Sequence, residues 1–210
     1  MLIFFKILFL RVKRKEIFSS LRDNKVTLVS GRVGEGRSTC LPQLCLQYLR
    51  ATNDSSSVLV ISSCRASSDW LSGRLSKELG VEDDAIIQDG RLHMSSNVDE
   101  IIALDHNTPK VCVIGANDAL RLLASRPLLD NYAFIILDDI DKRRVAQDFM
   151  MVLTKCHLSR DSHLKFVLNV STSKSNSEGV EIAKEMQSFL ETESFLHINI
   201  PKMKQHTFDL

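Results

Sequence analysis

The sequence has no large excess of charge of either sign. Its 27 Lys and Arg residues nearly balance its 26 Asp and Glu residues, which leaves a formal net charge of +1. Such a chain does not attract nucleic acid through a bulk positive field, so any nucleic-acid binding must use a local patch. Hydrophobic residues make up 44% and charged residues 25% of the 210 residues, which suits one domain with a sizeable core.

The chain also lacks the usual signs of disulfide or zinc chemistry. It has five cysteines, an odd number, and no two of them have C-x-x-C spacing. Cys40, Cys45 and Cys112 lie in apolar runs, where a thiol packs as a small hydrophobe. No two histidines have the i, i+3 or i, i+4 spacing of a helical metal site. We therefore expect a reducing compartment, the cytoplasm or the nucleus, and no disulfide-linked partner.

A membrane-spanning run of about 20 apolar residues is missing as well. The N-terminal run, residues 1–10 (MLIFFKILFL), is half that length and contains Lys6. Basic residues follow it, whereas a secretory signal carries its positive charge before the apolar run. We expect no membrane contact. Residues 1–14 are interpreted as an apolar and basic segment that packs on the domain, or as a start that is not the natural one.

Short apolar runs alternate with amphipathic stretches along the rest of the chain. Such runs are typical of strands buried on both faces. They are residues 26–30, 57–61, 110–114, 134–137, 164–170 and, more weakly, 195–200. Apolar spacing predicts helices around residues 71–79, 145–156 and 178–190. We expect Trp70, which falls on a helix pattern, to lie in the core. Strand–helix alternation predicts an α/β three-layer sandwich with a mostly parallel sheet, as one domain over residues 15–200, followed by a linker or tail at 201–210.

A glycine-rich loop follows the first predicted strand. Residues 31–39 read GRVGEGRST, in the strand–loop–helix context of a P-loop, whose backbone N–H groups wrap phosphate oxygens. Arg37 stands where a P-loop has lysine, and the swap is not conservative in a tight cradle. Glu35 adds a negative charge that opposes phosphate binding. A glycine-rich turn without a ligand remains the other interpretation. The nucleotide-binding candidates are Gly31, Gly34, Gly36, Arg37, Ser38 and Thr39.

An acidic cluster ends the fourth apolar run. Asp138 and Asp139 follow residues 134–137 directly, and an acid-tipped strand beside a P-loop is the arrangement that holds Mg²⁺. Asp138 and Ser38 are the candidate metal ligands. Asp139 would take the place of a glutamate that activates water, but its side chain is one methylene shorter. The cluster is also typical of a solvated acidic turn that caps the following helix.

These pieces match one family in order and spacing. Ser38-Thr39 followed by Pro42-Gln43 resembles the S-T-x-x-P-Q of motif I in the DEAH-box RNA helicases. Residues 135–143 (IILDDIDKR) resemble the family's I-I-L-D-E-A-H-E-R, and residues 58–80, 115–121 and 170–172 resemble its motifs Ia, Ib and III. The resemblance covers nearly the whole chain from Lys15 onward.

The departures from the family pattern all fall on its functional positions. Lysine is replaced by Arg37, glutamate by Asp139, histidine by Asp141, the motif Ib glycine by Asn117, and the first serine of S-A-T by Val170. The chain in this respect resembles germline DExH-type regulators with eroded motifs. Each change weakens ATP hydrolysis or its coupling to RNA, and none threatens the fold.

The resemblance implies a RecA-like domain that binds ATP or ADP with Mg²⁺ against a second RecA-like domain. It also implies RNA contacts at three positions, which are Arg65, Arg121 and Thr172. Two functions stay open: a pseudo-helicase module that binds RNA or a protein partner without hydrolysis, and an RNA-dependent ATPase that needs the second domain. A domain of another P-loop class is a third interpretation, against which Pro42-Gln43 argues. The module is our expectation, with Asp139 as a weak catalytic candidate.

Overall fold

Seven parallel strands form the centre of the molecule. The computed structural model describes residues 13–79, 93–95, 99, 110–160, 163–172 and 176–200. Its sheet has the order β3-β4-β2-β5-β6-β1-β7, and every neighbouring pair is parallel. The strands are β1 (Val26–Arg32), β2 (Ser57–Ser62), β3 (His93–Ser95), β4 (Lys110–Gly115), β5 (Tyr132–Leu137), β6 (Lys165–Thr172) and β7 (Phe195–Asn199).

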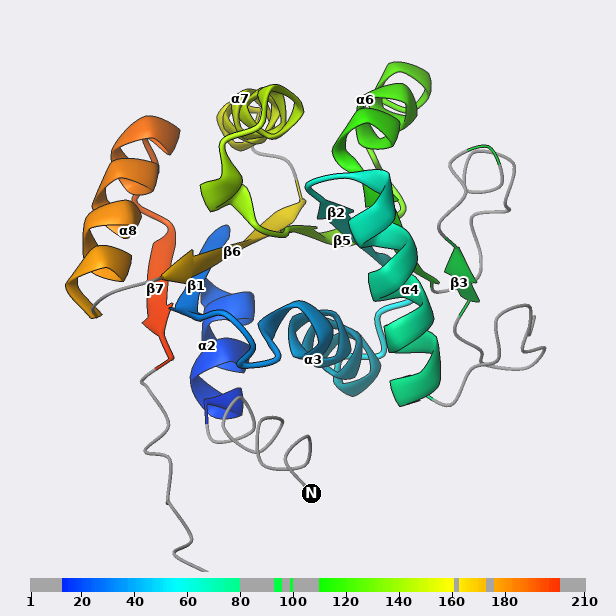
Figure 1. Ribbon diagram of the computed structural model, residues 1–210, viewed down its shortest axis with the longest axis horizontal. Helices are drawn as coiled ribbons and strands as arrows, with labels where there is room; N and C mark the ends of the chain where they lie inside the picture. Colours follow the sequence, from blue (N-terminus) through cyan, green and yellow to red (C-terminus); the bar gives the residue numbers. More distant parts are fainter. Residues whose placement is uncertain are drawn as a thin grey trace, which may run out of the picture.

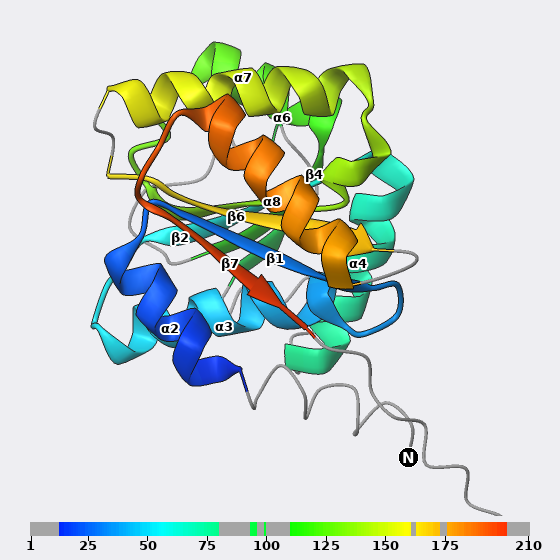
Figure 2. The same cartoon turned by 90° about the vertical axis from the view of Figure 1, so that its left-hand side faces the viewer.

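Helices cover both faces of this sheet (Figures 1 and 2). The layer formed by α2, α3 and α4 packs on one face, and the layer formed by α6, α7 and α8 packs on the other. The helices are α2 (Arg14–Asp23), α3 (Arg37–Ala51), α4 (Arg65–Leu79), α6 (Ala116–Ser125), α7 (Val145–Ser159) and α8 (Asn176–Leu190), with a short 3-10 helix η1 (Ile140–Lys142). The α/β three-layer sandwich expected from the alternation is confirmed.

Each central strand contributes to two separate cores. Leu59 and Ile61 of β2 point into the core under α6 and α7, whereas Val58 and Val60 point into the core under α3 and α4. All four side chains are at most 2% exposed. Burial on both faces is why these strands read as continuous apolar runs rather than alternating ones.

All six strands expected from the sequence are present, and β3 is an additional one. The predicted burial of Trp70 is wrong, because its side chain is 65% exposed. Helix α4 turns Leu71 and Leu75 toward the core, and a neighbouring position on a helix points about 100° away. Helix α7 is present as predicted, but the apolar face used to predict it points outward, with Phe149 57% exposed. Its buried side instead carries Met150 and Met151.

None of the helices in the described part of the chain is long and apolar enough to cross a lipid bilayer. The apolar segment at residues 1–10 and the expected linker at 201–210 lie outside the described residues.

Candidate functional site

The glycine-rich loop joins β1 to α3 at the carboxyl edge of the sheet. Gly34 and Gly36 both have left-handed backbone conformations, with φ of 83° and 78°. A side chain strains this conformation, so glycine is the residue that lets the chain reverse here. Gly36 is also the residue that precedes the first turn of α3. The strand, loop and helix therefore have the arrangement of a P-loop, with the amino end of α3 facing the loop.

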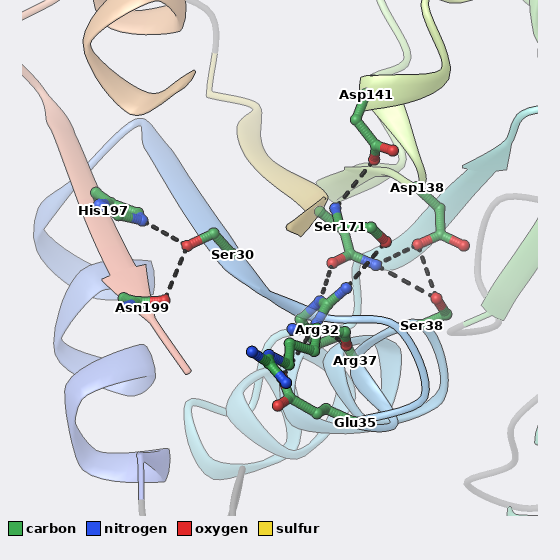
Figure 3. Close-up of polar contacts among 11 residues, drawn as sticks. Ser30, Arg32, Glu35, Arg37, Ser38, Asp138, Asp141, Ser171, His197 and Asn199 are labelled. Atoms are coloured by element: carbon green, nitrogen blue, oxygen red, sulfur yellow. Dashed lines mark hydrogen bonds and ion pairs between the residues drawn. The ribbon is translucent and has the colours of Figure 1, made fainter. Parts of the chain in front are cut away.

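The acidic turn lies against this loop. Asp138 follows β5 directly and is 6% exposed. The Ser38 hydroxyl of α3 donates a hydrogen bond of 3.0 Å to Asp138 Oδ1, across the intervening strand β6 (Figure 3). The two candidate metal ligands, 100 residues apart in the chain, are thus in direct contact.

An asparagine of β6 joins the loop to the acidic turn. Asn169 is 1% exposed, its Oδ1 accepts a 2.8 Å hydrogen bond from Arg37 Nε, and its Nδ2 donates to Asp138 Oδ1 and to Ser38 Oγ. Sequence reasoning missed this residue. Its signal was a polar side chain inside the apolar run 164–170, because a buried polar group needs hydrogen-bond partners.

Arg37 does not extend into solvent as a phosphate ligand would. It is 5% exposed, and its Nη1 donates to the Arg32 carbonyl at 2.6 Å while its Nη2 donates to Ser171 Oγ at 3.1 Å. Burial lowers the pKa of Arg37, and the charge of Glu35 acts in the opposite direction. The guanidinium group, which is cationic in proteins, is therefore held by acceptors of the protein itself.

The Asp138 carboxyl group is buried, which disfavours its ionised form. Burial is the main cause that raises its pKa to about 6, and the neighbouring charge of Asp139 acts in the same direction. Hydrogen bonds from Asn169 and Ser38 and the charge of Arg37 oppose the rise. The group is ionised at neutral pH but protonates in mildly acidic solution.

The rest of the acidic turn is fixed by its own hydrogen bonds. Asp139 has a left-handed backbone, with φ of 56°, which aspartate tolerates better than most residues. The buried Gln147 of α7 donates from Nε2 to the carbonyls of Asp138 and Asp139, both at 3.0 Å. Asp141 Oδ1 accepts a 3.0 Å hydrogen bond from the backbone N–H of Ser171. Gln147 is a second residue that sequence reasoning missed, and it holds the turn that carries the weak catalytic candidate.

A second polar cluster lies between β1 and β7 (Figure 3). Ser30 Oγ lies 2.7 Å from His197 Nε2 and donates to Asn199 Oδ1 at 3.2 Å. Because one hydroxyl has one proton, His197 Nε2 must be the donor to Ser30. Ser30 is 0% exposed, whereas His197 is only half-buried, and burial lowers the pKa of His197. The serine hydroxyl is therefore inaccessible to a substrate. It serves the packing of β7 rather than nucleophilic chemistry.

The three RNA-binding candidates occupy different environments. Arg65 is exposed at the first position of α4, and Arg121 is exposed on α6, where it pairs with Asp99 at 2.9 Å and with Asp118 at 3.6 Å. The start of α4 packs on Gly115, since a methyl group there would lie 2.9 Å from the Arg65 nitrogen. The segments with Arg65 and Arg121 therefore meet at one edge. Thr172 is 7% exposed at the end of β6, so its side chain offers little surface.

The site offers oxygen ligands for the Mg²⁺ of a magnesium nucleotide, but its loop does not fit the triphosphate. Ser38 Oγ and Asp138 Oδ1 are two hard oxygen donors side by side, which is the ligand type that Mg²⁺ uses beside phosphates. No group of three His, Cys, Asp or Glu side chains in the described residues could hold a metal by itself. The loop does not fit a triphosphate as it stands, because the side chains of Glu35 and Arg37 fill the space over Gly31.

The chain is similar in sequence to RNA helicases. No protein-family model matches the chain. It is 26% identical over 164 residues to the ATP-dependent RNA helicase DHX30 of Gallus gallus, and 28% identical over 166 residues to the ATP-dependent RNA helicase DHX29 of Homo sapiens. It is 26% identical over 165 residues to the probable ATP-dependent RNA helicase spindle-E of Drosophila virilis.

These alignments cover 74% to 76% of the chain but only 11% to 12% of each relative. The similarity therefore concerns one domain of a much longer protein. In sequence the chain is thus similar to one stretch of these RNA helicases, and its parallel α/β sandwich, with the loop beside the acidic turn, is consistent with a RecA-like domain of the DEAH-box type.

Proposed function

We propose that this domain binds the phosphate backbone of RNA and does not hydrolyse ATP by itself. The observation that carries the second half is the state of Arg37, whose guanidinium group hydrogen-bonds to Asn169, Arg32 and Ser171. A P-loop lysine reaches the outer phosphates as a flexible point charge. To reach a phosphate in this way, the planar guanidinium group of Arg37 would have to break its hydrogen bonds to these protein acceptors.

The proposal is also supported by the acidic turn. Asp139 stands at the position of the water-activating glutamate in the resembled motif, and proton transfer requires hydrogen-bond reach. The hydrogen bond from Gln147 to the Asp139 carbonyl holds the backbone of the turn in place. The backbone therefore does not move to compensate for the shorter side chain of Asp139.

RNA binding is supported by the exposed arginines Arg65 and Arg121 on two segments that meet at Gly115. The ion pair of Arg121 with Asp99 is exposed on both sides, and such pairs contribute about 0 to 1 kcal/mol, so RNA phosphates can displace Asp99. Contacts of this kind are independent of base sequence and sensitive to salt.

The test is binding of a labelled single-stranded RNA, measured by fluorescence anisotropy over a series of salt concentrations. The double variant Arg65→Ala/Arg121→Ala should bind more weakly than the wild type, and the slope of log affinity against log salt should fall by about 1.4, because each single-strand phosphate contact contributes about 0.7.

Arg50→Ala/Arg160→Ala is the matched control. It removes the same charge from two exposed arginines at or just beyond the carboxyl ends of α3 and α7, which lie at the other edge of the sheet. It should leave the slope at the wild-type value. Equal slopes for all three proteins would refute the assignment of the RNA surface.

The contact between Ser38 and Asp138 favours a second candidate, an RNA-dependent ATPase that forms when another RecA-like domain completes the site. Phosphate release should be measured for the wild type and for Arg37→Lys/Asp139→Glu, with and without such a domain fused to the chain. Hydrolysis by the fused wild type would favour the ATPase. Hydrolysis by the fused double variant alone would favour the proposed non-hydrolysing domain.

A further inference from the structure

The space over the first glycine of the loop is filled by two charged side chains. A methyl group on Gly31 would lie 2.5 Å from Glu35 Oε2 and 2.7 Å from Arg37 Nη1. Both distances are shorter than any van der Waals contact. The carboxylate and the guanidinium group therefore rest directly on the backbone at the start of the loop, next to Ile200.

The carboxylate of Glu35 uses the two kinds of donor that a phosphate would use. Its Oε2 accepts a 2.7 Å hydrogen bond from the backbone N–H of Arg32 and lies 3.3 Å from Arg37 Nη1. A glycine-rich loop binds phosphate through backbone N–H groups and one cationic side chain. The pair is also withdrawn from water, with the side chains of Arg37 and Glu35 only 4% and 13% exposed.

Glu35 is placed so that it can leave this position. It lies between Gly34 and Gly36, the two residues of the loop with positive φ, and glycine changes backbone conformation at little cost. The adjacent Val33 is 77% exposed, so the tip of the loop is not packed against the domain. Rotation at the two glycines would carry the carboxylate toward solvent, with loss of its hydrogen bonds to the Arg32 N–H and to Arg37.

We propose that Glu35 is an internal anion that competes with phosphate-bearing ligands for the loop. A polyphosphate in the loop and the Glu35 carboxylate would share the guanidinium group of Arg37, and their negative charges repel. Binding of the one therefore requires departure of the other. The competing ligand is a di- or triphosphate group, whether or not the domain binds RNA.

The test is titration of the full chain with inorganic pyrophosphate by calorimetry at physiological salt. Glu35→Ser removes the competing side chain, and pyrophosphate should bind it roughly tenfold more tightly than the wild type or better, since one negative charge at hydrogen-bond distance from a polyanion is lost. Glu35→Gln removes the charge but keeps an acceptor for the Arg32 N–H, so it should show a smaller gain of the same sign.

Two controls separate competition from a general effect of charge. Glu185→Gln makes the same change of charge on an exposed residue of α8 and should bind pyrophosphate like the wild type. Glu35→Ser/Arg37→Ala should lose the gain, because the released guanidinium group is what the ligand binds. Equal affinity of Glu35→Ser and the wild type would overturn the proposal, and so would a gain that survives loss of Arg37.

A folding failure of Glu35→Ser would not end the test, because Glu35→Gln retains the hydrogen bond to the loop and then decides it by the same comparison. RNA affinity, measured in parallel, should be equal in the wild type and Glu35→Ser. Loss of RNA binding in every protein would count against the proposed function alone and leave the competition at the loop to be judged from pyrophosphate.

Discussion

Replacing Asp138 by asparagine should stabilise the domain, and most strongly in alkaline solution. Burial raises the pKa of Asp138 to about 6 from an ordinary value of 3.8. Between pH 3.8 and about pH 6 the native state therefore holds a proton that the unfolded chain has already released, and stability is lost as the pH rises through this range. Each pKa unit corresponds to about 1.4 kcal/mol, so the ionised carboxylate costs the native state about 3 kcal/mol above pH 7.

Asparagine removes this cost and keeps an oxygen that accepts from Ser38 and Asn169. Asp138→Asn should be more stable than the wild type by about 2–3 kcal/mol at pH 8. In thermal unfolding this corresponds to an increase in Tm of about 5–10 °C for a domain of this size. The advantage should shrink as the pH falls through 6, where the wild-type carboxyl becomes neutral.

The measurement is urea unfolding followed by circular dichroism, at pH 8 and pH 5, with a chelator present so that no cation binds the carboxylate. Burial also lowers the pKa of His157 and His197, but these contributions are common to both proteins and cancel in the difference. Asp130→Asn, an exposed loop position, is the control and should change stability by less than about 0.5 kcal/mol at either pH. The reasoning would be refuted if Asp138→Asn were less stable than the wild type at pH 8. It would also be refuted if the difference in free energy of unfolding between the two proteins were the same at both pH values.

Two further changes test the packing of the site and of the helices. Asn169→Ala leaves the buried Arg37 Nε without an acceptor and removes one of the two side-chain donors to Asp138, so the free energy of unfolding by urea should fall by about 3 kcal/mol; a loss below about 1 kcal/mol would contradict the bridging role. Trp70→Ala should cost less than about 1 kcal/mol in the same assay, against about 3–5 kcal/mol for a core aromatic, because the indole is 65% exposed.

The sequence was informative wherever a local rule decides the structure. The glycine-rich run 31–39 predicted the loop, and Gly34 and Gly36 do have the positive φ that glycine adopts without strain. Pro42, which carries part of the motif I resemblance, lies within α3. The acid pair after residues 134–137 was predictable because parallel strands end at one edge, which brings Asp138 to the loop.

What could not be read from the sequence depends on non-local packing. Periodicity predicts a helix but does not say which of two apolar sides is buried, so α7 was expected from Phe149 although Met150 and Met151 face the core. The acid partner Asp99 of Arg121 comes from another segment of the chain, 22 residues away. Asn169 and Arg37 are 132 residues apart, and nothing in either local sequence specifies their hydrogen bond.

That hydrogen bond has a consequence for any ligand of the loop. One amide group touches the cation on one side and the buried acid on the other, so the two halves of the site cannot change independently. An anion that drew the guanidinium group of Arg37 away would leave Asn169 Oδ1 without its donor, and the same amide is bonded through Nδ2 to Asp138 and Ser38. A ligand at the loop therefore also acts on the acidic turn of the neighbouring strand.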